Sequence, residues 1–159
     1  MTFGLPFWLV ALSCVFVYMS IFPFIQLLNV SLINQFGFTS EVAGILYSVP
    51  YFMSAALSPI LGFTIDKIGK RALFITTSSF LVACSCFFDA FLPNKYEEPS
   101  FIVLGPLILV GFGYSIYASA LWSSIPYIVQ PRTIGSAFGL VTSLQACGLC
   151  IAPLVSGAL

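Results

Sequence analysis

The sequence predicts an all-α protein, a polytopic membrane bundle of five helices. Two observations carry this prediction: 60% of the 159 residues are hydrophobic, and only 6% are charged. An ordinary soluble domain carries about 25% charged residues, because its surface must face water. The composition therefore excludes a soluble globular protein, a disordered chain and a nucleic-acid binder, and it indicates an integral membrane protein.

Five apolar segments are each long enough to cross a bilayer, which takes about 20 helical residues. The first is interpreted as a true span because it is longer than the apolar part of a signal peptide and lacks a basic start. All five hold few charges, and none shows the alternating pattern of a membrane β-barrel strand. The predicted spans run over residues 7–28, 42–64, 73–92, 101–125 and 134–157.

Prolines interrupt most of these spans. Proline removes a helical hydrogen bond and bends the helix. Such breaks favour helices that line a pathway, although they are also frequent in membrane helices generally. The prolines are Pro23, Pro50, Pro59, Pro126 and Pro153.

The joints between the spans are short, so the chain is expected to be one membrane unit, residues 1–159. Lys67, Lys70 and Arg71 lie between the second and third spans, and Arg132 lies between the fourth and fifth. Basic residues favour cytosolic loops. We therefore predict that these joints and the start of the chain are cytosolic. The opposite side would carry Glu41, Asp89, Lys95, Glu97 and Glu98.

All five cysteines lie in apolar runs and are interpreted as packing residues. Cys147 and Cys150 have the C-x-x-C spacing of redox and metal sites, but no second pair and no histidine completes a zinc site. The sequence therefore predicts no metal and no cofactor. Histidine is absent and the acidic residues are scattered, so we do not expect an enzyme.

Small residues in the last span predict a close helix contact. Gly135 and Gly139 form a G-x-x-x-G pair, and Gly148, Ala152 and Ser156 also follow each other at four-residue spacing. Such spacing lets two helix backbones approach each other closely.

The most specific motif reads GFTIDKIGKR over residues 62–71, between the second and third spans. Gly62 would let one helix pack tightly against another, and Gly69 would supply a turn with positive φ. Asp66 could accept hydrogen bonds from a helix N-terminus or pair with an arginine. Lys67, Lys70 and Arg71 would anchor the loop at the cytosolic interface. An ordinary basic turn is the alternative, which agreement over ten positions disfavours.

This motif resembles the signature loop of the major facilitator superfamily, which follows the second helix of each six-helix half. The resemblance extends to the order of the spans, which resemble helices seven to eleven. It implies that the chain is a fragment of the C-terminal half, unable to transport alone, and that Asp66 and Arg71 belong to a gate network. The residues implied to control conformation are Gly62, Asp66, Lys67, Gly69, Lys70 and Arg71.

Further stretches resemble a lysosomal branch of this superfamily. They read VYMSIFPF at 17–24, SPILGFTIDK at 58–67, YSIYASALW at 114–122 and GSAFG at 135–139. This resemblance implies facilitated export (uniport) of dipeptides from the lysosome, with a glycosylated lysosomal membrane protein as accessory subunit. Two alternatives remain: a facilitator for a sugar or an organic anion, and a truncated membrane protein that binds the accessory subunit without transporting.

Polar and aromatic side chains at mid-span are the candidates for a substrate pathway. Tyrosine and tryptophan can hydrogen-bond a peptide backbone while packing against its side chains. Plain packing or an interfacial aromatic belt is the alternative for each. No acid or base lies at mid-span, so proton coupling is either absent or carried by another part of the protein. The candidates are Tyr18, Gln26, Tyr51, Tyr114, Tyr117, Trp122 and Gln145.

Overall fold

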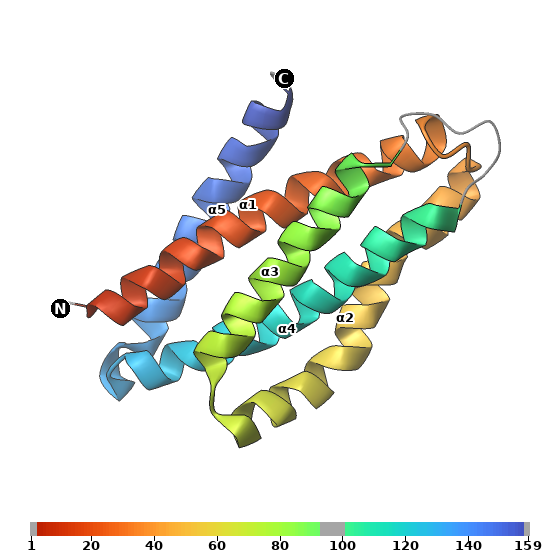
Figure 1. The fold of residues 1–159 in the computed structure, drawn as a ribbon. Helices are drawn as coiled ribbons and strands as arrows, with labels where there is room; N and C mark the ends of the chain where they lie inside the picture. The colour runs from red at the N-terminus through yellow and green to blue at the C-terminus, as the bar shows by residue number, and fades with distance from the viewer. Residues whose placement is uncertain (1–2, 93–100, 158–159) are drawn as a thin grey trace.

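The computed structural model describes residues 3–92 and 101–157, which form five long helices (Figure 1). Short 3-10 turns, Phe101–Val103 and Pro131–Thr133, precede the last two helices. The described residues contain no strand, and each long helix is apolar enough to cross a membrane, which confirms the predicted fold class. The helices are α1 (Leu5–Asn34), α2 (Ser40–Ile68), α3 (Arg71–Ala90), α4 (Leu104–Ile128) and α5 (Ile134–Gly157).

Two of the helices continue well past the predicted apolar spans. The first was predicted to end at residue 28 and ends at Asn34, and the second was predicted to end at residue 64 and ends at Ile68. Both extensions contain polar residues. The predicted spans counted only apolar residues, whereas backbone hydrogen bonds continue into polar segments that reach the membrane surface. The predicted joint over residues 93–99, with Lys95, Glu97 and Glu98, lies outside the described residues.

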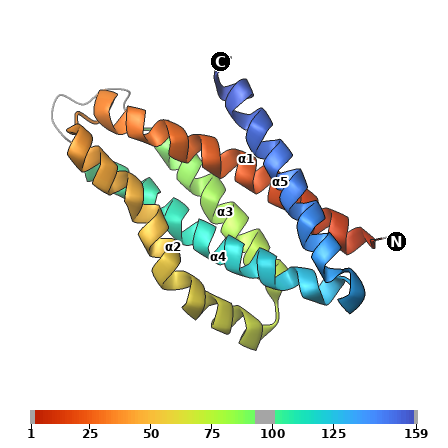
Figure 2. The same ribbon diagram turned by 180° about the vertical axis from the view of Figure 1, so that it is seen from behind.

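Helix α4 lies at the centre of the bundle, packed against α2 and α3 (Figure 2). Two glycines that the sequence analysis did not single out permit this packing. A Cβ atom at Gly111 would lie 3.1 Å from the Cα of Pro50 on α2, and one at Gly113 would lie 3.1 Å from Cγ2 of Val82 on α3. Between α3 and α4, the buried hydroxyl of Ser85 donates a hydrogen bond of 2.7 Å to the carbonyl of Pro106.

Helix α5 packs mainly against α1, and both views show the two helices crossing (Figures 1 and 2). A Cβ atom at Gly148 would lie 3.0 Å from Cγ1 of Val15 on α1, so the predicted close contact exists at this glycine.

The close contact predicted at Gly135 and Gly139 does not form within this chain. Atoms added at Gly135 or Gly139 would meet nothing within 4 Å among the described residues. The reason is helical geometry: Gly139 and Gly148 are nine residues apart, which places them about 180° apart around the helix. Among the described side chains of α5, the buried ones are Ala137, Val141 and Ala152, and Ala152 belongs to the predicted series that begins at Gly148; the side chain of Ser156 lies outside the described residues.

The cysteines divide into two groups. Cys14 is fully buried between helices, as expected for a packing residue, and Cys84 and Cys86 are half-buried. Cys147 and Cys150 are exposed on α5, so the interpretation of all five as packing residues is wrong for these two within this chain. Cys150 follows Gly148 by two positions, which places it about 160° around the helix from the contact with α1.

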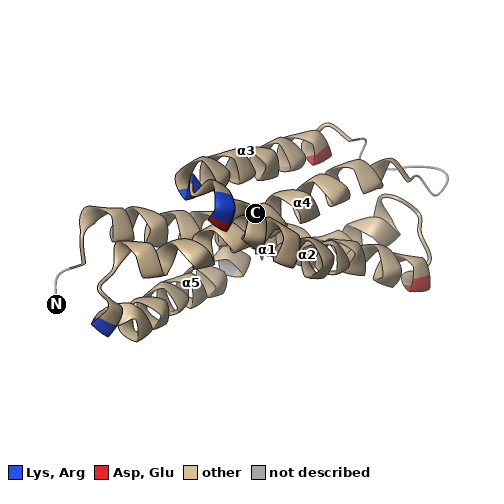
Figure 3. Cartoon of the chain, turned by 90° about the horizontal axis from the view of Figure 1, so that it is seen from below, with Lys and Arg blue, Asp and Glu red and all other residues tan. Residues whose placement is uncertain are grey.

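The described charges gather at the two ends of the bundle (Figure 3). Lys67, Lys70 and Arg71 lie in the α2–α3 connection, and Arg132 lies in the α4–α5 connection. Both connections lie at the end of the bundle where α1 begins. At the other end, Glu41 begins α2 and Asp89 lies in the last turn of α3. This separation leaves the long middle parts of the described helices uncharged.

Candidate functional site

The α2–α3 connection turns at Gly69, which adopts the left-handed conformation with φ of +72°. Its N–H donates a hydrogen bond of 2.8 Å to the carbonyl of Ile65 and thereby closes the end of α2. Side chains with a Cβ rarely adopt this conformation. The predicted positive-φ turn at Gly69 is therefore confirmed.

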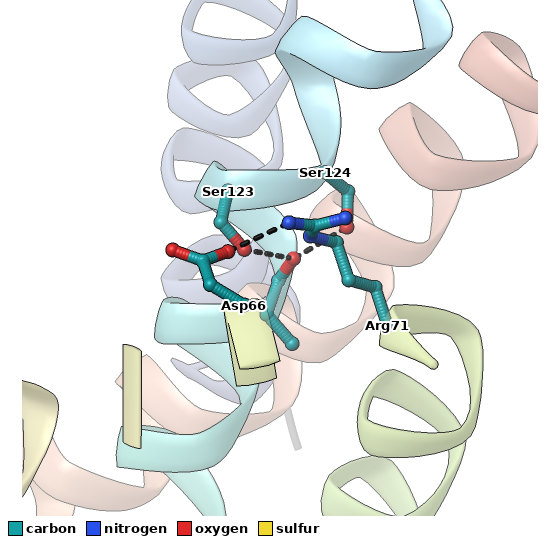
Figure 4. A network of polar contacts seen from close by, with 5 residues as sticks. Asp66, Arg71, Ser123 and Ser124 are labelled. Carbon is teal, nitrogen blue, oxygen red and sulfur yellow. Dashed lines mark hydrogen bonds and ion pairs between the residues drawn. The ribbon is translucent and has the colours of Figure 1, made fainter. Parts of the chain in front are cut away.

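Asp66 and Arg71 form an ion pair across this turn, with 2.6 Å between Oδ1 and Nη2 (Figure 4). Of the two partners predicted for Asp66, the arginine is the one observed. The Arg71 side chain is only 14% exposed, whereas that of Asp66 is 57% exposed. Arg71 is thus held against its neighbours, and the predicted anchoring at the cytosolic interface stays a prediction. Lys67 and Lys70 remain exposed.

The Arg71 guanidinium also lies against an aromatic ring that the sequence analysis missed. Its central carbon is 3.7 Å from the centre of the Tyr127 ring, in the last turn of α4. Arginine favours such stacking because its planar cation is attracted to the face of the ring. We call Asp66, Arg71 and Tyr127 the loop clamp, since together they tie the α2–α3 connection to α4.

Two serines of α4 lie near the clamp (Figure 4). The hydroxyls of Ser123 and Ser124 both donate hydrogen bonds to the carbonyl of Ala120 in the preceding turn. Their bonding capacity is therefore partly used within their own helix. Beside them lies a cavity of about 490 Å³, whose wall includes Val10 and Ile75.

Gly62 has no close neighbour in this structure. A Cβ atom there would meet no described atom within 4 Å, so the tight packing predicted for Gly62 does not occur between the helices of this chain.

Four of the predicted pathway residues form one cluster, which we call the aromatic cluster: Tyr18, Tyr114, Tyr117 and Trp122. The Tyr18 ring meets those of Tyr114 and Tyr117 edge to face, with ring centres 6.0 and 6.3 Å apart. The Tyr117 hydroxyl is 2.9 Å from the hydroxyl of Ser13 on α1. The cluster therefore joins α1 to α4.

The members of the aromatic cluster differ in burial. Tyr18 is 3% exposed and Tyr117 is fully buried, so their rings fill the contact between α1 and α4. Tyr114 and Trp122 are only half-buried. Trp122 stacks on Phe138 of α5, with 5.8 Å between ring centres and 8° between planes. Burial thus favours packing for the first pair and leaves the second pair accessible.

The remaining pathway candidates are Tyr51, Gln26 and Gln145. Tyr51 is exposed on α2, and its ring centre is 5.7 Å from that of Tyr47, one turn earlier. Gln26 is exposed on α1, and Gln145 is half-buried on α5. Tyr47 packs against the same buried residues as Tyr114, so Tyr51 lies on the α2 side of the aromatic cluster.

The five long apolar helices, with the loop clamp at one end of the bundle, are those of a polytopic α-helical membrane protein. The family model of the Major Facilitator Superfamily matches residues 3–159. The chain therefore belongs to the major facilitator superfamily, a family of membrane transporters.

Within this family, the chain is similar to individual curated transporters. The chain is 35% identical over 156 residues to the lysosomal dipeptide transporter MFSD1 of Bos taurus, and 34% identical over 155 residues to that of Homo sapiens. Each match covers 98% of this chain and 32% of the relative. Monocarboxylate transporter 1 of Bos taurus is 27% identical over 124 residues, or 77% of this chain and 24% of the relative. The chain thus spans about a third of the length of its dipeptide-transporting relatives.

Proposed function

We propose that this chain supplies helices seven to eleven, in the C-terminal half, of a facilitator that exports dipeptides from the lysosome by uniport. The observation that carries this proposal is the likeness to dipeptide transporters over 98% of the chain. Because the chain spans about a third of those relatives, the substrate cavity would form only with the remaining helices. The lipid bilayer and a glycosylated accessory membrane protein are the further partners of this proposal.

The aromatic cluster supports a peptide substrate. Tyr114 and Trp122 are half-buried, so each offers a polar atom and an apolar ring face to a ligand. Such groups can bind a peptide backbone without selecting one side chain, which suits a transporter of many dipeptides. The charged ends of the dipeptide would find their partners outside the described residues, whose charges lie near the helix ends.

The same charge distribution supports uniport. Proton-coupled transporters carry ionisable groups within the membrane. Among the described residues, Glu41 lies in the first turn of α2 and Asp89 in the last turn of α3, both away from mid-span. In this proposal the dipeptide gradient alone drives transport, by alternating exposure of the site to the two membrane faces, which requires no ionisable group at mid-span of this chain.

Flux measurements on the full-length gene product that contains this chain test the proposal. Proteoliposomes preloaded with a labelled dipeptide should release it down its gradient, at a rate independent of an imposed pH gradient. A monocarboxylate is the second candidate substrate, favoured by the 27% identity to a monocarboxylate transporter. Release of labelled lactate but not of dipeptide would replace the proposal by that alternative, and release that follows the pH gradient would contradict uniport.

A further inference from the structure

We propose that Tyr127 is a positioning residue: its ring holds the Arg71 guanidinium against Asp66 and so keeps the α2–α3 connection closed on α4. The contribution of this residue to transport rests on the proposed function. Its contribution to the closed loop does not, because the loop can be measured without any substrate.

The burial of Arg71 is the first step. A guanidinium carries five N–H groups and a full positive charge, so moving it out of water requires compensating contacts. The Arg71 side chain is 14% exposed, yet the structure gives it one ion pair, to Asp66. Its Nε atom is buried and has no hydrogen-bond partner among the described residues. One N–H group of Arg71 thus lacks a hydrogen-bond partner within the described part of the chain, and neighbouring groups other than Asp66 can add to the stabilisation of its charge.

Tyr127 supplies that contact. The ring centre lies 3.7 Å from the guanidinium carbon, well inside the range of about 6 Å over which a ring face attracts a cation. The ion pair uses the Nη2 atom of the guanidinium, while the ring lies closest to its central carbon. The two contacts therefore do not compete, and each restricts the movement that would break the other.

The positions of the three residues show what the stack controls. Asp66 lies in the last turn of α2, Arg71 is the first residue of α3, and Tyr127 lies in the last turn of α4. Without the ring, the ion pair would join only α2 to α3, which are already connected by the chain. With the ring, the same arginine also joins both to α4. Tyr127 thus adds a contact between this turn and the end of α4.

The loop contains its own probe of opening, since trypsin cleaves after lysine and arginine. We expect Tyr127→Leu to raise the initial rate of tryptic cleavage at residues 67–71 roughly two- to five-fold, because Tyr127 is exposed and a cation–ring contact at an exposed site contributes about 0.5–1 kcal/mol. Tyr127→Phe keeps the ring and should stay within two-fold of the wild type. Phe112→Leu removes another exposed aromatic side chain of α4, away from the clamp, and should leave the rate unchanged.

Three outcomes would overturn the proposal. Cleavage of Tyr127→Leu at the wild-type rate would show that the ring does not hold the loop. Equal cleavage of Tyr127→Phe and Tyr127→Leu would assign the effect to the hydroxyl group. An equal rise in Phe112→Leu would indicate general loosening of the bundle.

Transport by the full-length protein gives a second readout. The proposal requires that this contact differ between the two conformations of the transport cycle, so Tyr127→Leu should shift the dipeptide KM values from the two membrane faces in opposite directions, and Tyr127→Phe should not. A fall in maximal rate with both KM values unchanged would contradict the positioning role in transport. If the protein carries no dipeptide at all, the proposed function fails, while the proteolysis result still decides whether Tyr127 holds the loop.

Discussion

Gly111 on α4 lies directly against Pro50 on α2, so close that a Cβ atom on the glycine would approach the proline Cα to 3.1 Å. Two residues further along α4, Gly113 makes the same kind of contact with Val82 on α3. Small residues allow such close packing between helices in a membrane. The central position of α4 therefore depends on these two glycines.

Gly111→Leu should lower the free energy of unfolding by about 1–3 kcal/mol, because the added side chain would have to displace the backbone around Pro50. Gly139→Leu is the matched control, since a Cβ atom there meets nothing within 4 Å. Unfolding in detergent with increasing denaturant measures both. Equal stability of the two variants would show that the contact between Gly111 and Pro50 does not limit the packing of α4.

Gly69→Ala should destabilise the protein by about 1 kcal/mol, because alanine does not readily adopt the φ of +72° found at this turn. Gly62→Ala belongs to the same motif but lies within α2 in open space, so it should be neutral or slightly stabilising. Thermal unfolding of both variants in detergent provides the comparison. A larger loss of thermal stability in Gly62→Ala than in Gly69→Ala would contradict the prediction.

Asp66→Asn should lower transport while leaving the free energy of unfolding almost unchanged. The Asp66 carboxylate is 57% exposed, and exposed ion pairs contribute only about 0.2–1 kcal/mol, so the unfolding free energy should change by less than about 1 kcal/mol. In the full-length protein we nevertheless expect dipeptide flux to fall several-fold, because the clamp would lose its ionic contact. Insertion and thermal stability serve as controls. Wild-type flux would exclude a role for this ion pair in transport.

Tyr117→Phe should weaken packing without changing substrate recognition. It removes the hydrogen bond to Ser13, and hydrogen bonds between membrane helices contribute about 0.6 kcal/mol on average. A double-mutant cycle with Ser13→Ala should recover a coupling of this size. The dipeptide KM should stay unchanged, whereas Trp122→Leu should raise it. A rise in the dipeptide KM for Tyr117→Phe would indicate that the Tyr117 hydroxyl contributes to substrate binding despite the burial of the side chain.

The five helices and the turn at Gly69 could be predicted because both depend on local sequence. A run of about 20 apolar residues has one stable form in a bilayer, and a glycine within a basic joint marks a turn. The pairing of Asp66 with an arginine could be anticipated for the same reason, since Arg71 is five residues away.

The contacts between distant residues could not be predicted in this way. A helix that is apolar on all sides carries no pattern that shows which face meets which neighbour. The stack of Tyr127 on Arg71 joins residues 56 positions apart, and the contact of Gly111 with Pro50 joins residues 61 positions apart. The same lack of pattern explains why the burial of Tyr117 and the open space at Gly135 and Gly139 emerged only from the helix packing.

Counterflow by the full-length gene product tests the central claim most directly. Proteoliposomes loaded with an unlabelled dipeptide are diluted into buffer that contains a trace of the same dipeptide in labelled form, with no pH gradient. A uniporter that works by alternating access should accumulate the label transiently above its outside concentration, and Asp66→Asn should slow this accumulation. Label that never exceeds its level in protein-free liposomes would contradict dipeptide transport by this protein.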